Sequence, residues 1–579
     1  MSETEKICAT GLLNLRWAQA LADGLAAAAV ADLVLSPGSR STPLALAFLR
    51  QPKFRCHVIL DERSAAFFAL GLAKANDRPV ALLCTSGSAP ANWFPAVIEA
   101  DQCGTPLLLL SADRPAESQG WGANQTIDQA KLFGNHVRSF HAADTPHEGF
   151  SPAYLHHLAA RAVNESLWPL PGPVHLNLPF REPLLPASEA IRQSATPLPT
   201  AISSTPPRLL ADPQVIADIV RRISGRPGAI ICGGANYPAG FAEAVTALAA
   251  QLNSPILAEP LANLRFGTHK LEHLCVRYDG FLRDQPFVAA QRPEWLLRFG
   301  AFPVTRTLQD WLKTSASAQQ IVVTPDGRWR DPQHNTSILL QTDPVEACNA
   351  LRKTAPQPAT ATWRAAFTQA EAAITRITQS SLSQENFEGA LIPALIEGLP
   401  AGHRLFCGNS MVIRDLDAFS GCSEKPLRLF GNRGASGIDG NVSTAAGIAV
   451  GGPTVALLGD LTCAHDIGGL ANLRGLDLIL VVINNGGGGI FEYLPQAALT
   501  EFEHAWLTPS DIDFAHAAQA WGIPHQHADT LEKFKDALET ALAAGGPHFI
   551  ELIVDRAQSV AQHHAYWQRV SMASLPDSL

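Results

Sequence analysis

Two turns in the last third of the chain carry oxygen donors at a spacing that could hold a metal ion. Gly459-Asp460 ends one apolar run and Asn484-Asn485 ends the next, so that Asn485 stands 25 positions after Asp460. The carboxyl ends of parallel strands lie at one edge of an open sheet, where ligands bind. A carboxylate, an amide oxygen and a nearby backbone carbonyl suit Mg²⁺, which completes its coordination with water and phosphate oxygens. Either turn alone is an ordinary turn sequence, but together they predict a site for a metal and a diphosphate.

Glycines around these turns could bring the backbone close to the anion. Gly486 to Gly489 belong to the second turn, and a Gly-rich segment at residues 431–440 precedes both turns. Glycine allows a close backbone approach to a ligand. We also expect a helix that begins near Asp466 to direct its N-terminal amides toward the diphosphate.

The elements that must position these residues follow an α/β rhythm. Short apolar runs alternate with longer helical patterns, which predicts βαβ units around parallel sheets. Pro-rich stretches at residues 183–207 and 354–362 are typical of linkers. The predicted fold is therefore α/β, with three doubly wound parallel-sheet domains at residues 1–185, 205–353 and 385–579. The candidate strands are residues 33–35, 80–84, 107–110, 174–178, 229–232, 256–258, 295–299, 321–323, 454–458, 478–483 and 549–554.

The composition excludes several classes of protein. Of the 579 residues, 46% are hydrophobic and 17% are charged, which excludes a disordered or coiled-coil chain. The formal net charge of -10 argues against a general nucleic-acid surface, so an anionic ligand must meet a local cluster of Arg. Ten cysteines without a C-x-x-C pair are typical of free thiols in a reducing compartment. Without a basic signal region or an unbroken spanning run, we expect a cytoplasmic protein that makes no membrane contact.

The spacing of the two turns resembles a motif of thiamine diphosphate enzymes. By that resemblance, Asp460, Asn485 and the carbonyl of Gly487 hold Mg²⁺, or Mn²⁺, on the diphosphate of the cofactor. Many relatives carry a third Asn where this chain has Gly486. Counting back from Ile490-Phe491 makes Asn485 the ligand and leaves Asn484 as the alternative.

Further segments narrow the resemblance within this group. They resemble the 2-succinyl-5-enolpyruvyl-6-hydroxy-3-cyclohexene-1-carboxylate synthase family of menaquinone biosynthesis. The resemblance implies that 2-oxoglutarate is decarboxylated and that the resulting succinic semialdehyde carbanion equivalent is added to isochorismate. The segments that carry it are residues 36–41, 61–64, 85–87, 112–115, 122–125 and 408–410, with Arg414 and residues 431–440.

Glu62 is the acidic residue that this resemblance assigns to cofactor activation. The triplet Asp61-Glu62-Arg63 alone indicates a solvated helix start with Asp61 as its cap, whereas the matching segments around it favour the functional interpretation. A protein carboxyl group that hydrogen-bonds to the aminopyrimidine ring of the cofactor would assist proton exchange. Burial near Phe67 and Phe68 would disfavour the charged form of the Glu62 carboxyl group. The cofactor-binding residues implied in the same way are Glu62, Ser410, Gly437, Ile438, Gly459, Asp460, Asn485 and Ile490.

The implied substrates are both dicarboxylates, which an acidic protein must bind through placed guanidinium groups. Arg matches a carboxylate with paired hydrogen bonds, so Lys would not replace it. The resemblance implies that Arg40 and Gln125 act with Glu62 in catalysis. In the central domain, relatives often carry two adjacent basic residues, whereas this chain has Arg306 followed by Thr307. The implied substrate-binding residues are Ser39, Arg40, Arg114, Asn124, Gln125, Arg306, Arg414, Arg433 and Phe491.

The resemblance also implies an assembly, and other functions compete with it. In this cofactor group the two halves of one active site usually come from different subunits, so we expect a homodimer or a dimer of dimers. One alternative is another thiamine diphosphate carboligase, similar to acetolactate synthase and with a flavin in the central domain. A dinucleotide-binding oxidoreductase and a non-catalytic scaffold are further alternatives. We interpret His465, His563 and His564 as structural or solvent-facing, because nothing in the sequence fixes their partners.

Overall fold

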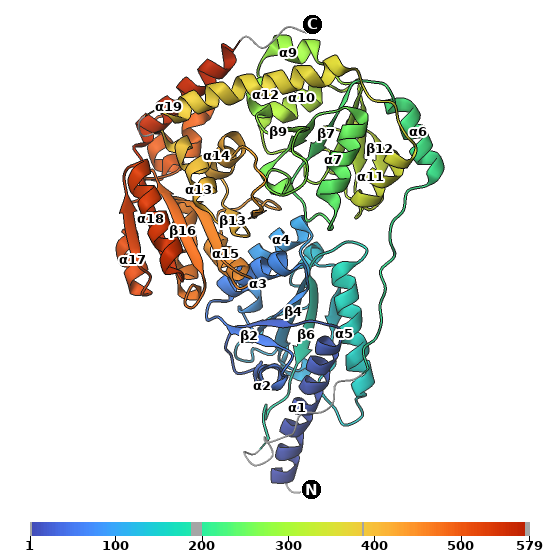
Figure 1. Cartoon of the computed structure of the whole chain (residues 1–579). Helices are drawn as coiled ribbons and strands as arrows, with labels where there is room; N and C mark the ends of the chain where they lie inside the picture. Colours follow the sequence, from blue (N-terminus) through green and yellow to red (C-terminus); the bar gives the residue numbers. More distant parts are fainter. Residues whose placement is uncertain (1–2, 187–199, 385–386, 574–579) are drawn as a thin grey trace. The chain divides into compact units, whose positions relative to one another are not determined.

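Three sheets of parallel strands organise residues 3–186, 200–384 and 387–573, the part of the chain that the computed structural model describes. Each sheet has six strands and is flanked by helices (Figure 1). The predicted α/β class with three doubly wound parallel sheets is therefore confirmed. Residues 187–199 of the predicted first linker and the predicted domain start at residue 385 lie outside the described residues.

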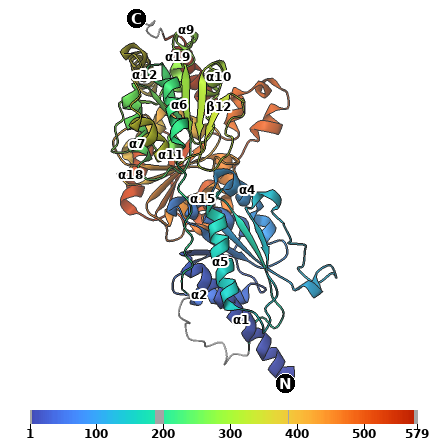
Figure 2. The same ribbon diagram turned by 90° about the vertical axis from the view of Figure 1, so that its right-hand side faces the viewer.

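The first sheet has the strand order β2-β1-β3-β4-β6-β5, so its winding reverses between β1 and β3. Every residue of β3 and β4 is buried, as expected for parallel strands covered on both faces. Helices α1 and α5 lie side by side (Figure 2), and a Cβ on Gly24 would lie 2.9 Å from that of Ala159. The strands are β1 Asp32–Leu35, β2 Arg55–Val58, β3 Val80–Cys84, β4 Leu107–Asp113, β5 Phe140–Ala142 and β6 Val174–Pro179. The helices are α1 Glu3–Ala27, α2 Thr42–Arg50, α3 Glu62–Asn76, α4 Phe94–Cys103 and α5 Pro152–Leu167.

The central sheet has the order β12-β11-β10-β7-β8-β9 and reverses between β10 and β7. Gly228 pairs with Trp295 across these two strands, and a Cβ at Gly228 would overlap the indole ring. The strands are β7 Gly228–Cys232, β8 Ile256–Ala258, β9 Leu274–Cys275, β10 Trp295–Phe299, β11 Gln319–Val323 and β12 Thr336–Leu340. The helices are α6 Pro213–Ile223, α7 Phe241–Leu252, α8 Tyr278–Phe281, α9 Gln285–Ala290, α10 Arg306–Thr314, α11 Pro344–Lys353 and α12 Ala361–Leu382.

The third sheet has the order β14-β13-β15-β16-β18-β17 and reverses between β13 and β15. Gly459 at the end of β15 pairs with Ile483 near the end of β16, so both strands leave the sheet at the same edge. The strands are β13 Arg404–Cys407, β14 Arg428–Phe430, β15 Thr454–Gly459, β16 Leu478–Asn484, β17 His525–Ala528 and β18 His548–Ile553. The helices are α13 Leu391–Gly398, α14 Met411–Phe419, α15 Asn441–Ala449, α16 Asp460–His465, α17 Phe514–Ala520, α18 Leu531–Ala544 and α19 Arg556–Ser571.

The chain divides into two compact units, one with the first sheet and one with the other two sheets. The first unit comprises Met1–Pro207, Asn432–Gly452 and His465–Leu476, and the second comprises Arg208–Gly431, Pro453–Ala464 and Asp477–Leu579. Within the first unit α15 packs against α3, where a Cβ on Gly71 or on Gly447 would lie 2.0 Å from a backbone carbonyl oxygen of the other helix. The three predicted domain ranges stay a prediction.

Three further features of the described residues bear on the sequence-based expectations. None of the helices in the described ranges is both long enough and apolar enough to cross a membrane. The cysteines from Cys56 to Cys463 are free thiols. The helix expected near Asp466 is a 3-10 helix, Ile467–Asn472, whereas the α-helix at this sheet edge, α16, begins at Asp460.

Candidate active site at the carboxyl edges of the sheets

The predicted metal ligands meet where β15 and β16 end. Asp460 is only 3% exposed and is the first residue of α16. One of its carboxylate oxygens accepts the N–H of Leu461 at 2.7 Å and the other accepts the N–H of Gly487 at 2.8 Å. The turn after β16 is thereby tied to the turn after β15, and a carboxylate, an amide and a carbonyl share one small region.

Asn484 and Asn485 differ in what their side chains do. The Asn484 amide group donates to Glu551 at 2.7 Å, and its oxygen accepts the N–H of Gly486 at 3.1 Å. The Asn485 side-chain oxygen is buried and has no hydrogen-bond partner among the described residues. A buried polar atom without a partner is costly, and a bound cation would satisfy it. The geometry therefore favours Asn485 over Asn484 as the ligand.

The donor set fits a hard divalent cation. Burial raises the pKa of Asp460 despite the N–H groups that its carboxylate accepts, and a cation beside it would favour the charged form. The Gly487 carbonyl oxygen accepts the Gly489 N–H at 2.9 Å, and the second lone pair of this oxygen could bind a cation. The described residues contain no group of three or more His, Cys, Asp or Glu that could hold a metal, so a site here depends on amide and carbonyl oxygens, as Mg²⁺ sites often do.

The glycine run after β16 is required by close packing. Gly487 has φ 146°, and a Cβ there would lie 2.5 Å from the Leu507 carbonyl oxygen. A Cβ on Gly488 would lie 2.7 Å from the Trp506 carbonyl oxygen and 2.9 Å from the Phe491 ring. The extra glycines thus let the backbone pass between these groups, and the half-buried Ile490 and Phe491 follow directly.

Ser410 lies just beyond β13, beside the point where the third sheet reverses its winding. Such reversal points are where open α/β sheets bind ligands. Ser410 caps α14 with φ 71° and ψ -130°, a conformation that costs a non-glycine residue on the order of 1–3 kcal/mol. Its carbonyl oxygen accepts the guanidinium N–H of Arg414 at 2.6 Å. The predicted cofactor residue and the predicted substrate residue are therefore linked in the first turn of one helix.

In the first unit, Glu62 opens α3 directly after β2 and the turn that follows it. Asp61 caps the helix and accepts the N–H of Arg63 at 2.8 Å, as the sequence alone indicates. Glu62 itself is half-buried, whereas Phe67 and Phe68 are buried in the core. Within the part of the chain that the structure describes, no hydrogen bond holds the Glu62 carboxylate. The predicted desolvation of Glu62 is thus only partial in the single chain.

Two predicted substrate arginines lie close together at the edge of the first sheet. Arg40 is buried, donates to the Phe180 carbonyl at 2.9 Å and pairs with Glu182 at 2.5 Å. Arg114 donates to the Ser86 hydroxyl and to the Gln125 carbonyl. Burial and the nearby charge of Arg40 lower the pKa of Arg114. The buried Nε of Arg40 has no hydrogen-bond partner among the described residues.

The Gly-rich segment is fixed to the first unit by a buried acid. Glu99 on α4 accepts the N–H groups of Gly434 and Ala435 at 2.9 and 2.6 Å. Lys74 on α3 contacts both Glu99, at 3.3 Å, and the Asn432 side chain, at 2.8 Å. The segment that contains Arg433, Gly437 and Ile438 is therefore held in place, and Ile438 is 37% exposed.

Comparison with known proteins assigns the chain to a family. Residues 15–132 match the family described as "Thiamine pyrophosphate enzyme, N-terminal TPP binding domain", and residues 418–552 match "Thiamine pyrophosphate enzyme, C-terminal TPP binding domain". A curated 2-succinyl-5-enolpyruvyl-6-hydroxy-3-cyclohexene-1-carboxylate synthase from Dechloromonas aromatica is 50% identical over 94% of this chain and 99% of its own length. The chain belongs to this synthase family.

Other relatives agree with this assignment, and a solved structure has a similar fold. Synthases of the same name from Geobacillus kaustophilus and Chloroflexus aurantiacus are each 43% identical, over 96% of this chain and 97% and 96% of their own lengths. The crystal structure of benzoylformate decarboxylase from Polynucleobacter necessarius is similar with a TM-score of 0.70, covering 93% of this chain and 98% of that one. At 18% sequence identity, it supports the fold alone.

Some residues expected from the synthase family are not gathered into these clusters. Arg306 begins α10, has an 80% exposed side chain and pairs with Asp310 at 3.0 Å on its own helix. Ser39 and Asn124 are exposed. Their roles stay predictions.

Sequence reasoning missed a buried polar cluster in the second unit of the chain. His563 on α19 is 2% exposed and pairs with Asp415 on α14 at 3.2 Å. The Ser559 hydroxyl donates to Glu388, which begins a 3-10 helix at Glu388–Ala390. Burial and the Asp415 charge raise the pKa of Glu388 to about 7. Although burial opposes it, Asp415 raises the pKa of His563 to about 9. A structural role for His563 is consistent with the sequence-based interpretation, and its burial excludes the solvent-facing alternative.

The His563–Asp415 pair predicts how stability depends on pH. Because the pKa of His563 is raised from 6.5 to about 9 in the folded chain, its stabilisation is complete below pH 6.5 and is lost as pH rises to 9. The pKa of Glu388 is also raised, from 4.5 to about 7, so its contribution to stability also falls as pH rises, but over that lower pH range. We expect the free energy of unfolding to fall by about 3 kcal/mol between pH 6.5 and 9, measured by urea unfolding.

His563→Gln should remove most of this dependence of stability on pH, whereas His564→Gln, at an exposed neighbour, should keep it. Equal slopes in all three proteins would refute the assignment.

Proposed function

We propose that this chain catalyses the thiamine diphosphate-dependent decarboxylation of 2-oxoglutarate and the addition of the resulting succinic semialdehyde unit to isochorismate. The product would be 2-succinyl-5-enolpyruvyl-6-hydroxy-3-cyclohexene-1-carboxylate, for menaquinone biosynthesis. The observation that carries the proposal is 50% identity to a synthase of that name over 94% of this chain. The buried oxygen cage at Asp460 and the paired cations Arg40 and Arg114 support it independently.

The cofactor would be held at the third sheet. Asp460, Asn485 and the Gly487 carbonyl would bind Mg²⁺ or Mn²⁺ on its diphosphate, and the backbone of the glycine run would lie beside it. When bound, thiamine diphosphate supplies the electron sink that decarboxylation needs. Glu62 would hold a proton on its carboxyl oxygen and hydrogen-bond the aminopyrimidine ring. Ile438, which is 37% exposed in the chain, would contact the cofactor through the apolar surface of its side chain.

The cations of the chain would select dicarboxylate substrates. Arg40 and Arg114 are held close enough for the Arg40 charge to lower the pKa of Arg114, an effect that Glu182 only partly offsets, so a substrate carboxylate between them would relieve the remaining repulsion. Arg414 and Arg433 would bind further carboxylate groups with paired hydrogen bonds. Gln125, whose amide donates to the Ser86 carbonyl at 3.0 Å, would orient the substrate beside Arg114. These residues supply positioning and charge complementarity rather than acid–base chemistry.

The activity is tested by product analysis with two 2-oxoacids. The protein is incubated with isochorismate, thiamine diphosphate, Mg²⁺ and either 2-oxoglutarate or pyruvate, and the products are identified by mass spectrometry. We expect the succinyl adduct from 2-oxoglutarate and at least about 100-fold less product from pyruvate, since pyruvate leaves one guanidinium unpaired. Acetolactate from pyruvate, in place of the succinyl adduct, would favour the acetolactate synthase-like alternative.

We further propose a cytoplasmic homodimer or dimer of dimers in which each active site is shared. The free thiols of the described cysteines suit a reducing compartment. Glu62 of one subunit would then complete the site built around Asp460 of another.

Shared sites predict complementation between two inactive variants. Glu62→Gln and Asp460→Ala chains are each expected to be inactive, but co-refolding them should restore one intact site in each mixed dimer. Random pairing of equal amounts then gives about a quarter of wild-type activity per chain, measured as adduct formed per minute. Activity no higher than that of either variant alone would show that the two residues do not serve one shared site.

A further inference from the structure

Helix α14 is anchored to the rest of the second unit through buried charges along its length. Asp417 pairs with Arg265, whose side chain is fully buried. The Tyr278 hydroxyl, at the start of α8, contacts both oxygens of the same carboxylate at 2.7 and 2.8 Å. Near the middle of the helix, Asp415 pairs with His563 of α19 at 3.2 Å. Burying two carboxylates on one short helix is destabilising unless each of them is paired, and both are paired here.

The C-terminal end of α14 receives two further cationic contacts. Arg265 donates to the carbonyl of Asp417 at 2.7 Å and to the Ser420 hydroxyl at 3.1 Å. Arg277 donates to the carbonyl of Ala418. Positive groups at the last carbonyls of a helix satisfy acceptors that the helix leaves unpaired and oppose the negative end of its dipole. Both arginines come from the chain around β9, so the central sheet holds the end of α14.

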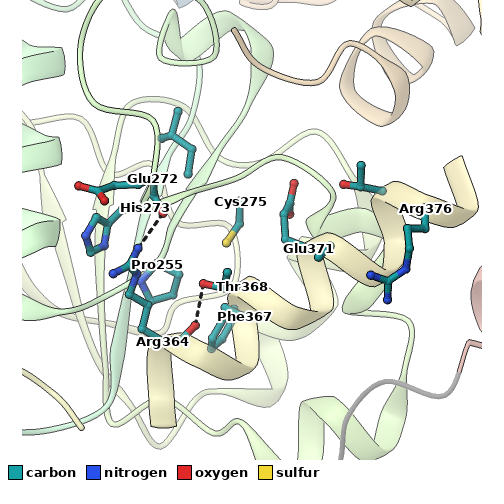
Figure 3. Close-up of a pocket in the computed structure, with 12 residues that line it drawn as sticks. Pro255, Glu272, His273, Cys275, Arg364, Phe367, Thr368, Glu371 and Arg376 are labelled. Carbon is teal, nitrogen blue, oxygen red and sulfur yellow. Dashed lines mark hydrogen bonds between the residues drawn. The ribbon is translucent and has the colours of Figure 1, made fainter. Parts of the chain in front are cut away.

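The arginine clamp is itself fixed by an acid on α12. Glu371 accepts the backbone N–H groups of Val276 and Arg277, at 3.1 and 3.0 Å. It lines a cavity of about 400 Å³ with Cys275 and Arg376, and Figure 3 shows Glu371 extending from α12 toward the segment that carries Cys275. Arg277, two positions after Cys275, therefore has little freedom to move and contacts α14 from a fixed position.

The opposite end of α14 carries the strained Ser410 and the linked Arg414. Ser410 has φ 71°, a conformation that persists in a non-glycine residue only where the surroundings over-determine it. The Arg414 guanidinium donates to the Ser410 carbonyl at 2.6 Å. Because a helix transmits a displacement along its axis with little compression, fixing residues 415–418 fixes the first turn as well. The anchors thus hold both groups at the reversal point of the third sheet.

We propose that Arg265, with Tyr278 and Arg277, is a positioning residue that sets where α14 presents Ser410 and Arg414 to the substrate. The inference rests on the proposed function, which makes these two residues part of the binding site. Arg265 touches neither substrate nor cofactor in this account. It acts through Asp417 and the helix.

Arg265→Lys tests the proposal with a matched control. Lys keeps the buried charge beside Asp417 but loses the planar fork that contacts five oxygen-bearing groups at once. The control is Arg298→Lys, at another buried Arg–Asp pair, whose partners Gln320, Arg330 and Asp331 all belong to the central-sheet region. Both variants should lower thermal stability to a similar extent, so stability alone cannot separate them.

The two variants should differ in substrate binding and in local exchange. For Arg265→Lys we expect KM for 2-oxoglutarate or isochorismate to rise about tenfold or more, with kcat reduced less than about threefold. Arg298→Lys should change both values less than about twofold. Hydrogen–deuterium exchange of the ligand-free protein should be faster for the peptide covering residues 408–419 in Arg265→Lys only. Exchange does not depend on turnover, so it also tests the clamp if the wild-type protein makes no adduct and the proposed function fails.

Identical KM values and identical exchange at residues 408–419 in the two variants would overturn the inference. If Arg265→Lys does not fold, Tyr278→Phe replaces it, because this change removes one hydroxyl and leaves the ion pair intact. We then expect a smaller rise in KM, about threefold, and faster exchange of the same peptide. An unchanged KM and unchanged exchange in folded Tyr278→Phe would likewise contradict a positioning role.

Discussion

Glu62→Gln is expected to lower kcat by about 10²- to 10⁴-fold, the usual contribution of a placed acid–base group. Gln has nearly the shape of Glu but cannot exchange a proton with the aminopyrimidine ring. The Glu62 carboxylate is half-buried and accepts no hydrogen bond from the described part of the chain, so the free energy of unfolding should change by less than about 0.5 kcal/mol. Steady-state kinetics and urea unfolding measure the two quantities.

Asp61→Asn is the matched control for this variant. It removes the same charge from the adjacent residue, and Asn still caps the first turn of α3. We expect kcat to stay within about twofold of wild type. If Glu62→Gln also stayed in that range, Glu62 would have no part in catalysis.

Asp460→Ala is expected to abolish the stabilisation that thiamine diphosphate and Mg²⁺ give to the wild-type protein. At ligand concentrations 100-fold above Kd, binding should add about 2.7 kcal/mol to the free energy of unfolding. The variant lacks the buried carboxylate that faces the turn after β16, so its unfolding should not respond to the added cofactor and metal. Thermal unfolding with and without both ligands measures the difference.

The neighbouring amides provide the control pair for the metal site. Asn485→Ala removes the buried oxygen without a partner and should also abolish the ligand-induced stabilisation. Asn484→Ala instead breaks the hydrogen bond to Glu551 and should lower the free energy of unfolding by about 1 kcal/mol while keeping the response to ligands. The reverse outcome would make Asn484 the ligand.

Most interior strands could be predicted from sequence because burial on both faces makes them continuous apolar runs, but the short interior strand β13 was missed because Arg404 leaves only three apolar residues in it. β3 and β15 begin at the predicted positions and β16 extends the predicted run by one residue. The edge strands β2 and β17 were missed because polar residues that are exposed or only half-buried, Arg55 and His525, break the apolar pattern. Hydrophobic periodicity reports burial, and edge strands are buried on too few positions to produce it.

Site residues could be predicted where a local sequence pattern marks them, but not where they depend on a partner far away in the sequence. Asp460 and Asn485 could be found because each ends an interior strand, and strand ends share one sheet edge. The pairing of Asp415 with His563, 148 positions apart, could not be found, because isolated polar residues on helices carry no pattern that identifies a distant partner. The Asp417–Arg265 pair was missed for the same reason.

The most direct test of the account follows the carbon atoms of 2-oxoglutarate labelled with ¹³C at its 1-carboxyl group. With isochorismate, thiamine diphosphate and Mg²⁺ present, we expect the label to leave as carbon dioxide, one molecule for each unlabelled succinyl adduct formed. Omitting either the cofactor or the metal should stop both products. Label retained in the adduct, or neither carbon dioxide nor adduct from a folded protein saturated with cofactor, would contradict the proposed synthase activity.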